Sequence, residues 1–104
     1  MKTTIVIAAA LTLGTAATWA AGPEDAMTKA GCFACHLKDK KLVGPSYKDV
    51  AAKYKGQADA VAKLSEKVRK GGSGNWGPVP MAPNPPDKIN DADLKAAVEM
   101  ILKS

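Results

Sequence analysis

Four stretches of the chain carry helix signals, and in the last three of them apolar residues recur at helical spacing. In the first, Pro23 followed by two acidic residues is typical of a helix start, because proline suits the first helical position and acids stabilise the positive end of the helix dipole. The second stretch begins at Ser46, which can form a capping box with Asp49. We expect these two helices to end at Gly31 and Gly56.

The second half of the chain predicts two further helices. Residues 58–70 place Val61, Leu64 and Val68 on one face of a third helix. Asn90 is the expected cap of a fourth. The apolar stripe of that last helix is Leu94, Ala97, Val98 and Ile101. No stretch shows the alternation of a strand, so the predicted fold class is all-α, with long loops.

Between the third and fourth helices, residues 71–86 contain four glycines and five prolines. Proline fixes its own φ angle and pushes the residue before it towards extended backbone. Met81 lies within this segment, directly after Pro80. The composition therefore predicts a stiff, extended segment, called the strap below, that carries Met81.

The first 20 residues have the pattern of a secretory signal peptide. Lys2 precedes a short apolar stretch, and small residues follow up to Ala20. The apolar stretch is far shorter than the ~20 residues that span a bilayer, and no later stretch is long enough. We expect a leader over residues 1–20, cleavage near Ala20, and a periplasmic domain over residues 21–104 without stable membrane insertion.

That domain is small for a chain without a covalent or metal staple. Domains of about 80 residues usually need one, because their buried surface barely offsets chain entropy. A disulfide between Cys32 and Cys35 would close a tiny loop and remove little unfolded-state entropy. A large bound cofactor is the better candidate.

The formal net charge of +5 does not indicate a nucleic-acid partner. The lysines are spread along the whole chain, and no stretch alternates basic and aromatic residues. A solvated helix surface explains most of them.

Residues 32–36 read Cys-Phe-Ala-Cys-His, the pattern of c-type haem attachment. Two thiols about one helical turn apart can each add to a haem vinyl group, and the next residue then points its imidazole at the iron. The sequence predicts one haem c, bound covalently through Cys32 and Cys35, with His36 as an axial iron ligand. Two alternatives, a thioredoxin-like redox site and half of a zinc site, lack supporting residues. The first expects a preceding strand and a parallel sheet, and zinc needs four ligands.

A second axial ligand must approach the face of the haem opposite His36, which disfavours the nearby Met27. Met100 lies beside the apolar stripe of the fourth helix, where methionine ordinarily fills gaps in a core. Met81 remains, and its strap lowers the entropic cost of holding a weak thioether ligand. We expect Met81 to be this ligand, with a buried structural methionine as the alternative.

At this point the chain resembles the small bacterial class I cytochromes c, in particular the cytochrome c-551 (cytochrome c8) group. The resemblance covers essentially residues 21–104 and rests on the stretches 31–36, 43–54, 76–81 and 83–84. It implies the class I cytochrome c fold, with about four helices and long loops wrapped around one covalently bound haem. Phe33, which is bulky between the cysteines, and Ala82, where proline is common, depart from the group's pattern.

The resemblance also implies roles for residues around the two ligands. Pro45 would offer its carbonyl to the ring N–H of His36, and Asn84 would hydrogen-bond near the Met81 sulfur. Trp76 would donate its indole N–H to a haem propionate. Taken alone, Pro45 is also typical of a helix start, and Trp76 of a core.

Iron held by histidine and methionine has no vacant position for oxygen, peroxide or substrate. The predicted function is therefore a soluble single-electron carrier, not an enzyme, between respiratory redox proteins such as a nitrite reductase or a terminal oxidase. A positive reduction potential is expected, because the soft thioether favours ferrous iron. The alternative is a haem peroxidase or a gas-binding haem module with an open sixth position.

Redox proteins are expected to dock transiently at the haem edge of a monomeric carrier. The expected apolar patch at that edge consists of Phe33, Leu42, Val43 and Val79. The basic residues expected to face acidic patches on partners are Lys38, Lys40 and Lys41. Lys67 and Arg69 are weaker candidates for propionate partners, with a solvated helix end as the alternative for each.

Overall fold

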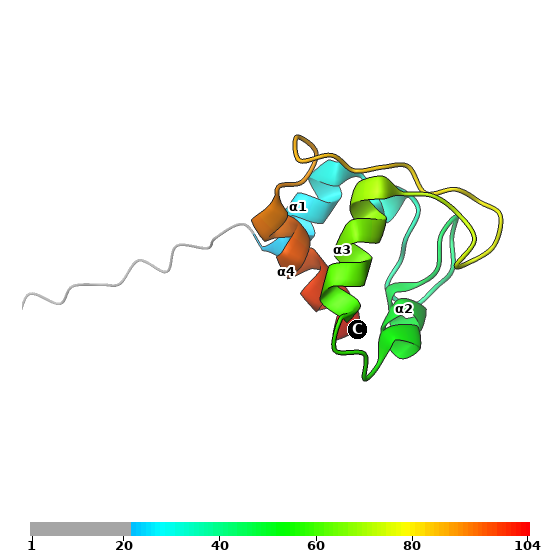
Figure 1. The fold of residues 1–104 in the computed structure, drawn as a ribbon. Helices are drawn as coiled ribbons and strands as arrows, with labels where there is room; N and C mark the ends of the chain where they lie inside the picture. The colour runs from blue at the N-terminus through cyan, green and yellow to red at the C-terminus, as the bar shows by residue number, and fades with distance from the viewer. Residues whose placement is uncertain (1–21) are drawn as a thin grey trace, which may run out of the picture.

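The computed structural model describes residues 22–104, and the expected leader over residues 1–20 lies outside them. The elements along the chain are α1 (Pro23–Ala30), the short 3-10 turn η1 (Cys32–Ala34), α2 (Tyr47–Tyr54), α3 (Ala60–Lys70) and α4 (Asp91–Leu102) (Figure 1). The strand-like pairs in this part of the chain are two isolated bridges, His36 with Lys41 and Gly72 with Met81. The prediction of an all-α fold is confirmed.

The residues that predicted the helix starts occupy the positions expected of them. Pro23 is at the first turn of α1. The Ser46 hydroxyl accepts a hydrogen bond from the Asp49 backbone N–H at 3.1 Å, and the Asn90 side-chain oxygen accepts one from the Asp93 N–H at 2.8 Å. Each side chain satisfies a backbone donor that has no partner within its helix.

The start of α3 differs from the prediction, because the helix begins at Ala60 rather than at residue 58. A turn follows α2 there: the Gln57 N–H donates to the Tyr54 carbonyl, and the Ala60 N–H donates to the Gln57 carbonyl. These bonds use residues 57–59 to reverse the chain. The helix therefore opens two residues later, after Asp59.

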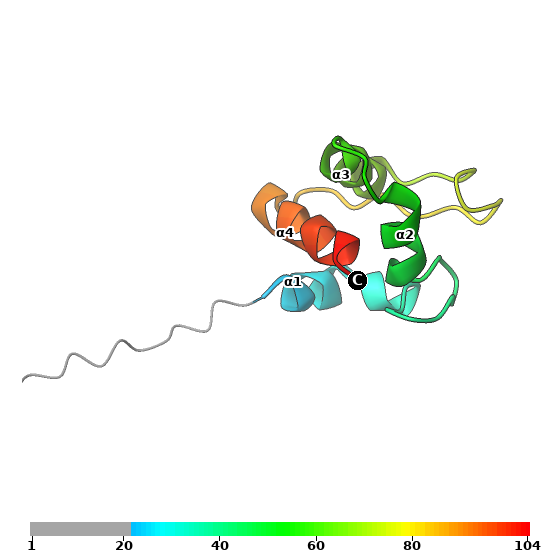
Figure 2. The same ribbon diagram turned by 90° about the horizontal axis from the view of Figure 1, so that it is seen from below.

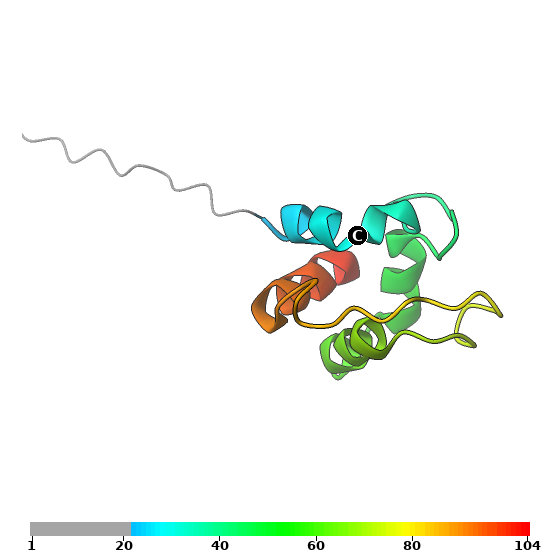
Figure 3. The ribbon, with the colours of Figure 1, turned by 90° about the horizontal axis from the view of Figure 1, so that it is seen from above.

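The core is built around α4, which contacts α1, α2 and α3. In views from below and above, α4 passes between α1 and α3 (Figures 2 and 3). Leu94, Ala97 and Val98 of the predicted stripe are buried, and Ile101 packs against the same core. The stripe prediction is confirmed. The other buried members of this core are Met27, Tyr47, Val50, Leu64 and Ile89.

Two long loops extend from the helices on the same side of the molecule (Figures 2 and 3). One joins η1 to α2 and contains the His36–Lys41 bridge. The other is the strap, which runs from α3 towards α4 without regular structure apart from the Gly72–Met81 bridge. Among the described helices, none has both the length and the apolar character that crossing a bilayer requires.

Candidate functional site

One cavity of about 830 Å³ lies between the helices and the two long loops. Pockets for small molecules and cofactors typically measure about 300–1,000 Å³. The four residues that the sequence predicts to bind haem all line it: Cys32, Cys35, His36 and Met81. A second hollow of about 530 Å³, beside α2 and the C-terminal residues, is lined by none of the four. The structure therefore brings the predicted ligand set together in one place.

The two thiols and the imidazole are grouped by a sharp change of backbone direction after α1. Gly31 has φ +82°, a left-handed conformation that glycine adopts without strain, and it ends the helix. The next residues form η1, in which the N–H groups of Cys35 and His36 both donate to the Cys32 carbonyl. One short turn thus presents Cys32, Cys35 and His36 to the same cavity.

Both cysteines are free and half-buried. Burial raises the pKa of the Cys32 thiol above its ordinary value, and a backbone hydrogen bond partly opposes this effect. The prediction requires a thioether bond from each sulfur to a cofactor. Two unpaired thiols on one cavity wall suit this attachment.

The ring of His36 is fixed in one orientation. Its Nδ1–H donates to the Pro45 carbonyl at 2.8 Å, so in the neutral ring the proton is on Nδ1 and the lone pair for a metal is on Nε2. The Tyr47 ring stacks on the imidazole with 5.4 Å between centroids and 18° between planes. Burial raises the pKa of the Tyr47 hydroxyl, which stays neutral. The hydrogen bond that the resemblance implied for Pro45 is present, and the bond from His36 to iron stays a prediction.

Gly44 fits against the face of the His36 ring, a role that the sequence did not reveal. A Cβ atom added at Gly44 would overlap the imidazole Cε1 atom and lie 2.8 Å from Nδ1. The Gly44 N–H also donates to the Cys35 carbonyl at 2.8 Å, which folds the loop back over the motif. The sequence signal that could have shown this role is the position of Gly44 directly before Pro45, whose carbonyl binds the same ring. Helical periodicity carries no information about such a contact.

Among the methionines that the structure describes, Met81 alone lines the cavity. Met27 is buried in the helical core, and Met100 packs against that core. Both positions agree with the reasons for setting these two residues aside. Met81 itself is held by the bridge to Gly72, in which each backbone N–H donates to the partner's carbonyl at 2.9 Å.

Gly71, the first residue of the strap, lies directly against the part of the strap that carries Met81. It has φ +65°, and a Cβ atom there would overlap the Met81 carbonyl oxygen and lie 2.9 Å from backbone atoms of Ala82 and Pro83. Only a residue without a side chain allows this approach of two backbone segments. The end of α3 and the segment that carries Met81 are thus in direct contact.

Trp76 lines the cavity but is not a core residue, because 40% of it is exposed. The Lys53 ammonium lies 4.5 Å from the centroid of the Trp76 ring and donates to the Asn75 carbonyl at 3.0 Å. This lysine from α2 therefore contacts the outer turn of the strap. A propionate partner for the Trp76 indole stays a prediction.

Asn84 is buried, and its amide bonds to backbone rather than to sulfur. Its side-chain nitrogen donates to the carbonyls of Val68, at 3.2 Å, and Ala82, at 3.1 Å. Both N–H groups of the amide therefore have backbone acceptors, whereas the resemblance implied a hydrogen bond near the Met81 sulfur. The contact joins the strap to the last turn of α3.

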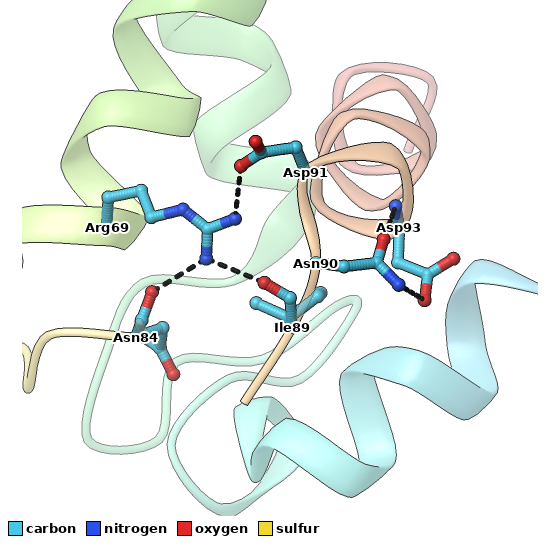
Figure 4. A network of polar contacts seen from close by, with 6 residues as sticks. All are labelled: Arg69, Asn84, Ile89, Asn90, Asp91 and Asp93. Atoms are coloured by element: carbon cyan, nitrogen blue, oxygen red, sulfur yellow. Dashed lines mark hydrogen bonds and ion pairs between the residues drawn. The ribbon is translucent and has the colours of Figure 1, made fainter. Parts of the chain in front are cut away.

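The two basic candidates at the end of α3 separate in the structure. Lys67 lines the cavity, whereas Arg69 does not. The Arg69 guanidinium donates to the carbonyls of Asn84 and Ile89 and pairs with the Asp91 carboxylate (Figure 4). For Arg69 the solvated helix end is wrong, because the side chain is only 19% exposed and its hydrogen bonds go to the chain. Since Arg69 does not line the cavity, no described contact supports it as a propionate partner.

The expected apolar patch is largely present around the cavity. Leu42, Val43 and Val79 line the cavity and are 50%, 51% and 58% exposed. Phe33 does not belong to this patch. It is half-buried against the core, with its ring edge-on to Tyr47 at 6.1 Å between centroids. We refer to Leu42, Val43 and Val79 as the apolar rim.

The cavity fits the haem that the sequence predicts. Its lining is mainly apolar, it holds two unpaired thiols, and its imidazole is oriented by a backbone carbonyl. Gly44 allows the loop to pack directly against that imidazole, where a side chain would clash. The described residues contain no group of three or more His, Cys, Asp or Glu that could hold a metal ion without a cofactor.

Comparison with known proteins places this chain among named relatives. Residues 20–104 match the family model described as Cytochrome c. The chain is 52% identical to cytochrome c2 of Rubrivivax gelatinosus over an aligned stretch of 84 residues, which covers 81% of this chain and 99% of that protein. It is 45% identical over 84 residues to cytochrome c-551 of Pseudomonas aeruginosa, covering 81% of this chain and 78% of the other.

Solved structures agree with these sequence matches. The crystal structure of wild-type cytochrome c552 of Nitrosomonas europaea superposes with a TM-score of 0.71 at 45% identity, covering 77% of this chain and 96% of that one. The stretch that matches the family model, residues 20–104, includes every residue that lines the cavity.

Proposed function

Because this chain belongs to the cytochrome c family, as a small class I member of the c-551 type with one covalently attached c-type haem, we propose that His36 and Met81 are the axial ligands of its iron. The haem supplies an iron that accepts and releases one electron. Like the relatives it matches, the chain is an electron carrier and not an enzyme. We further propose that it works in the periplasm and passes electrons between respiratory redox proteins, such as a nitrite reductase or a terminal oxidase.

The observation that carries this proposal is the convergence of four side chains on one cavity. Cys32, Cys35 and His36 reach it from a single turn, and Met81 reaches it from the strap. The two thiols anchor the cofactor, and the Pro45 carbonyl holds the imidazole with its Nε2 atom free. With both axial positions taken by protein side chains, no position is left for a substrate.

The protein's own residues also set the expected direction of the reduction potential. The Met81 thioether is soft and neutral, so it favours the reduced iron, and the mainly apolar lining disfavours the additional charge of the oxidised iron. We expect a positive reduction potential.

The apolar rim is the surface through which we propose that redox partners dock. It is exposed and adjoins the cavity, and Lys41 lines the same opening. Lys38 and Lys40 are exposed on the same loop. A small apolar contact surrounded by positive charge suits brief encounters of a monomeric carrier with acidic partners, at rates that fall as ionic strength rises.

Export is the remaining part of the proposal. The leader over residues 1–20 would direct the chain out of the cytoplasm, with cleavage near Ala20 and a mature domain over residues 21–104. The mass of the purified protein measures both the cleavage site and the added haem.

Two matched variants of the purified holoprotein test the ligation. Met81→Leu removes the thioether at nearly constant volume, and Met100→Leu makes the same change against the core. We expect the wild type and Met100→Leu to show the absorption of a thioether-ligated ferric haem and to resist added imidazole. Met81→Leu should lose this absorption and bind imidazole readily. A wild type that binds imidazole as readily as Met81→Leu has an open sixth position and contradicts the proposal.

A further inference from the structure

We propose that Arg69 is a positioning residue for the Met81 ligand, holding the strap in the place from which the thioether reaches the iron. This inference rests on the proposed ligation by Met81. It starts from the side chain of Arg69, which lies in the last turn of α3 and is only 19% exposed. A solvated helix end would leave such a side chain free, whereas this one is directed inward (Figure 4).

One guanidinium connects α3 to both ends of the segment that leads from the ligand to α4. Its Nη1 atom donates to the Asn84 carbonyl at 2.9 Å and to the Ile89 carbonyl at 2.6 Å. Asn84 follows Met81 by three residues, and Ile89 is a buried core residue just before the start of α4. Arg69 therefore fixes the strap relative to the core and to α3 at once.

Asn84 completes the contact in the opposite direction. Its backbone N–H and its side-chain amide both donate to the Val68 carbonyl, and the amide also donates to the carbonyl of Ala82. The carbonyls at the end of a helix lack partners within the helix, so the strap supplies them here. Arg69 donates to the strap, and the strap donates to the end of α3.

Met81 and the residues that follow it are thus both held. The Gly72 bridge fixes the N–H and the carbonyl of Met81 itself, and the contacts of Ala82 and Asn84 fix the chain on its C-terminal side. Removing the guanidinium would leave two carbonyls without their charged donor. The strap would then spend less time in the ligating position, and a competing ligand would gain apparent affinity by the same factor.

The carbonyl contacts matter more than the ion pair in this arrangement. The Asp91 carboxylate pairs with Arg69 at 2.6 Å but is 93% exposed, and exposed ion pairs contribute little. The planar fork of arginine serves several acceptors in fixed directions, which a lysine ammonium on a flexible stem does not reproduce. Arg69→Lys therefore tests geometry at constant charge.

The neighbouring residue supplies a matched control. Lys70 carries the same charge, but its side chain is 75% exposed and pairs with Glu66 on the same helix. Lys70→Met removes one positive charge at the end of α3 without touching the strap. It measures how much of any effect comes from charge alone.

The experiment measures imidazole binding to the ferric holoproteins, together with amide hydrogen exchange. Since hydrogen bonds from charged donors are among the stronger ones, we expect Arg69→Met to bind imidazole about tenfold more tightly than the wild type. Arg69→Lys should show about a threefold gain, and Lys70→Met less than about a twofold gain. In Arg69→Met the amides of Met81 and Asn84 should exchange faster by about the same tenfold factor, while the buried Val98 amide in α4 changes less.

Each result supports or overturns the inference. Unchanged imidazole affinity in Arg69→Met, or full retention of wild-type affinity in Arg69→Lys, overturns it. Faster exchange of Val98 in step with Met81 and Asn84 also overturns it, because Arg69 would then stabilise the whole fold and not the strap. A wild type without a thioether-ligated iron instead overturns the ligation proposed above, so the two failures are distinguishable.

Discussion

The His36 side of the cavity and the Met81 side are held in different ways. On the first, residues close in sequence act on the ligand's own side chain: the Pro45 carbonyl accepts from the ring, and Tyr47 stacks on it. On the second, the contacts act on the backbone, and they come from Gly72 and from the last turn of α3, where Arg69 also binds the Ile89 carbonyl before α4.

The chemistry of the two ligands explains this difference. An imidazole has a second ring nitrogen whose hydrogen bond can fix the side chain while the first binds iron. A thioether has no donor and accepts only weakly, so nothing can tie it down directly. The position of Met81 must therefore come from a rigid strap, and that strap needs support from elements that are already folded.

Gly71→Ala should break the Met81 side with the largest effect. The new Cβ atom would overlap the backbone of Met81 to Pro83, which cannot rotate away as a side chain could. The alanine would also have to adopt the φ of +65° that Gly71 has. We expect a loss of about 3 kcal/mol in the free energy of unfolding, from strain and overpacking combined. The thioether absorption of the ferric protein should be lost as well. Chemical denaturation and the visible spectrum measure these two effects.

The control for this variant is Gly74→Ala. Gly74 also has positive φ, +111°, but a Cβ atom there has nothing within 4 Å. Strain alone should cost about 1 kcal/mol and leave the thioether absorption intact. Equal losses in the two variants would show that the contact between Gly71 and residues 81–83 is unimportant.

Gly44→Ala should break the His36 side with a smaller effect. The added Cβ atom would overlap the imidazole, which is a side chain and not backbone, and Gly44 does not have a positive φ. We expect a loss of about 2 kcal/mol in unfolding free energy. The thioether absorption should persist, because the strap is untouched.

For this variant Gly22→Ala is the control, since a Cβ atom at Gly22 has nothing within 4 Å and its backbone is extended. Its unfolding free energy should match that of the wild type within about 0.5 kcal/mol. If Gly44→Ala instead lost the Met81 ligand, the two sides of the cavity would not be independently held.

The sequence predicted one of these two sides better than the other, for a physical reason. The ring bond to Pro45 was implied by the family resemblance. The haem motif and the cap at Ser46 involve residues close together in the chain, and such contacts follow from spacing. The role of Arg69 does not. In the sequence it is one of three basic residues in the last turn of α3, and its partners lie 15 to 22 positions away.

The fold shows the same division. Helix-start residues and apolar spacing predicted the four helices, because these are local properties, and proline content predicted the irregular strap. The close approaches at Gly44 and Gly71 depend on where two segments meet, which no local pattern records. Phe33 was placed wrongly for a related reason: its neighbours in the motif face the cavity, whereas its ring packs on Tyr47.

Pro45→Ala tests how the His36 side is held, because the hydrogen bond to the ring comes from a backbone carbonyl and not from the proline ring. The alanine keeps the carbonyl, so the His36 Nδ1–H resonance of the reduced protein should keep its position. Unfolding free energy should fall by only about 0.5 kcal/mol, through the greater freedom of the unfolded chain. A displaced ring resonance would show that the proline is needed to aim the carbonyl.

Lys53→Met probes the outer turn of the strap and should have the smallest effect. Lys53 donates to the Asn75 carbonyl and lies over the Trp76 ring, but the hydrogen bond is exposed. Exposed contacts of this kind contribute about 0.5 kcal/mol, so stability should change little and the Met81 ligand should stay in place. The local signature is a shifted indole N–H resonance of Trp76, which Lys55→Met, an exposed neighbour on the same stretch of chain, should not produce. A loss of thioether absorption in Lys53→Met would show that the strap is held at its outer turn as firmly as at its base. The contrast between a methionine held through its backbone and a histidine held through its side chain would then need a different explanation.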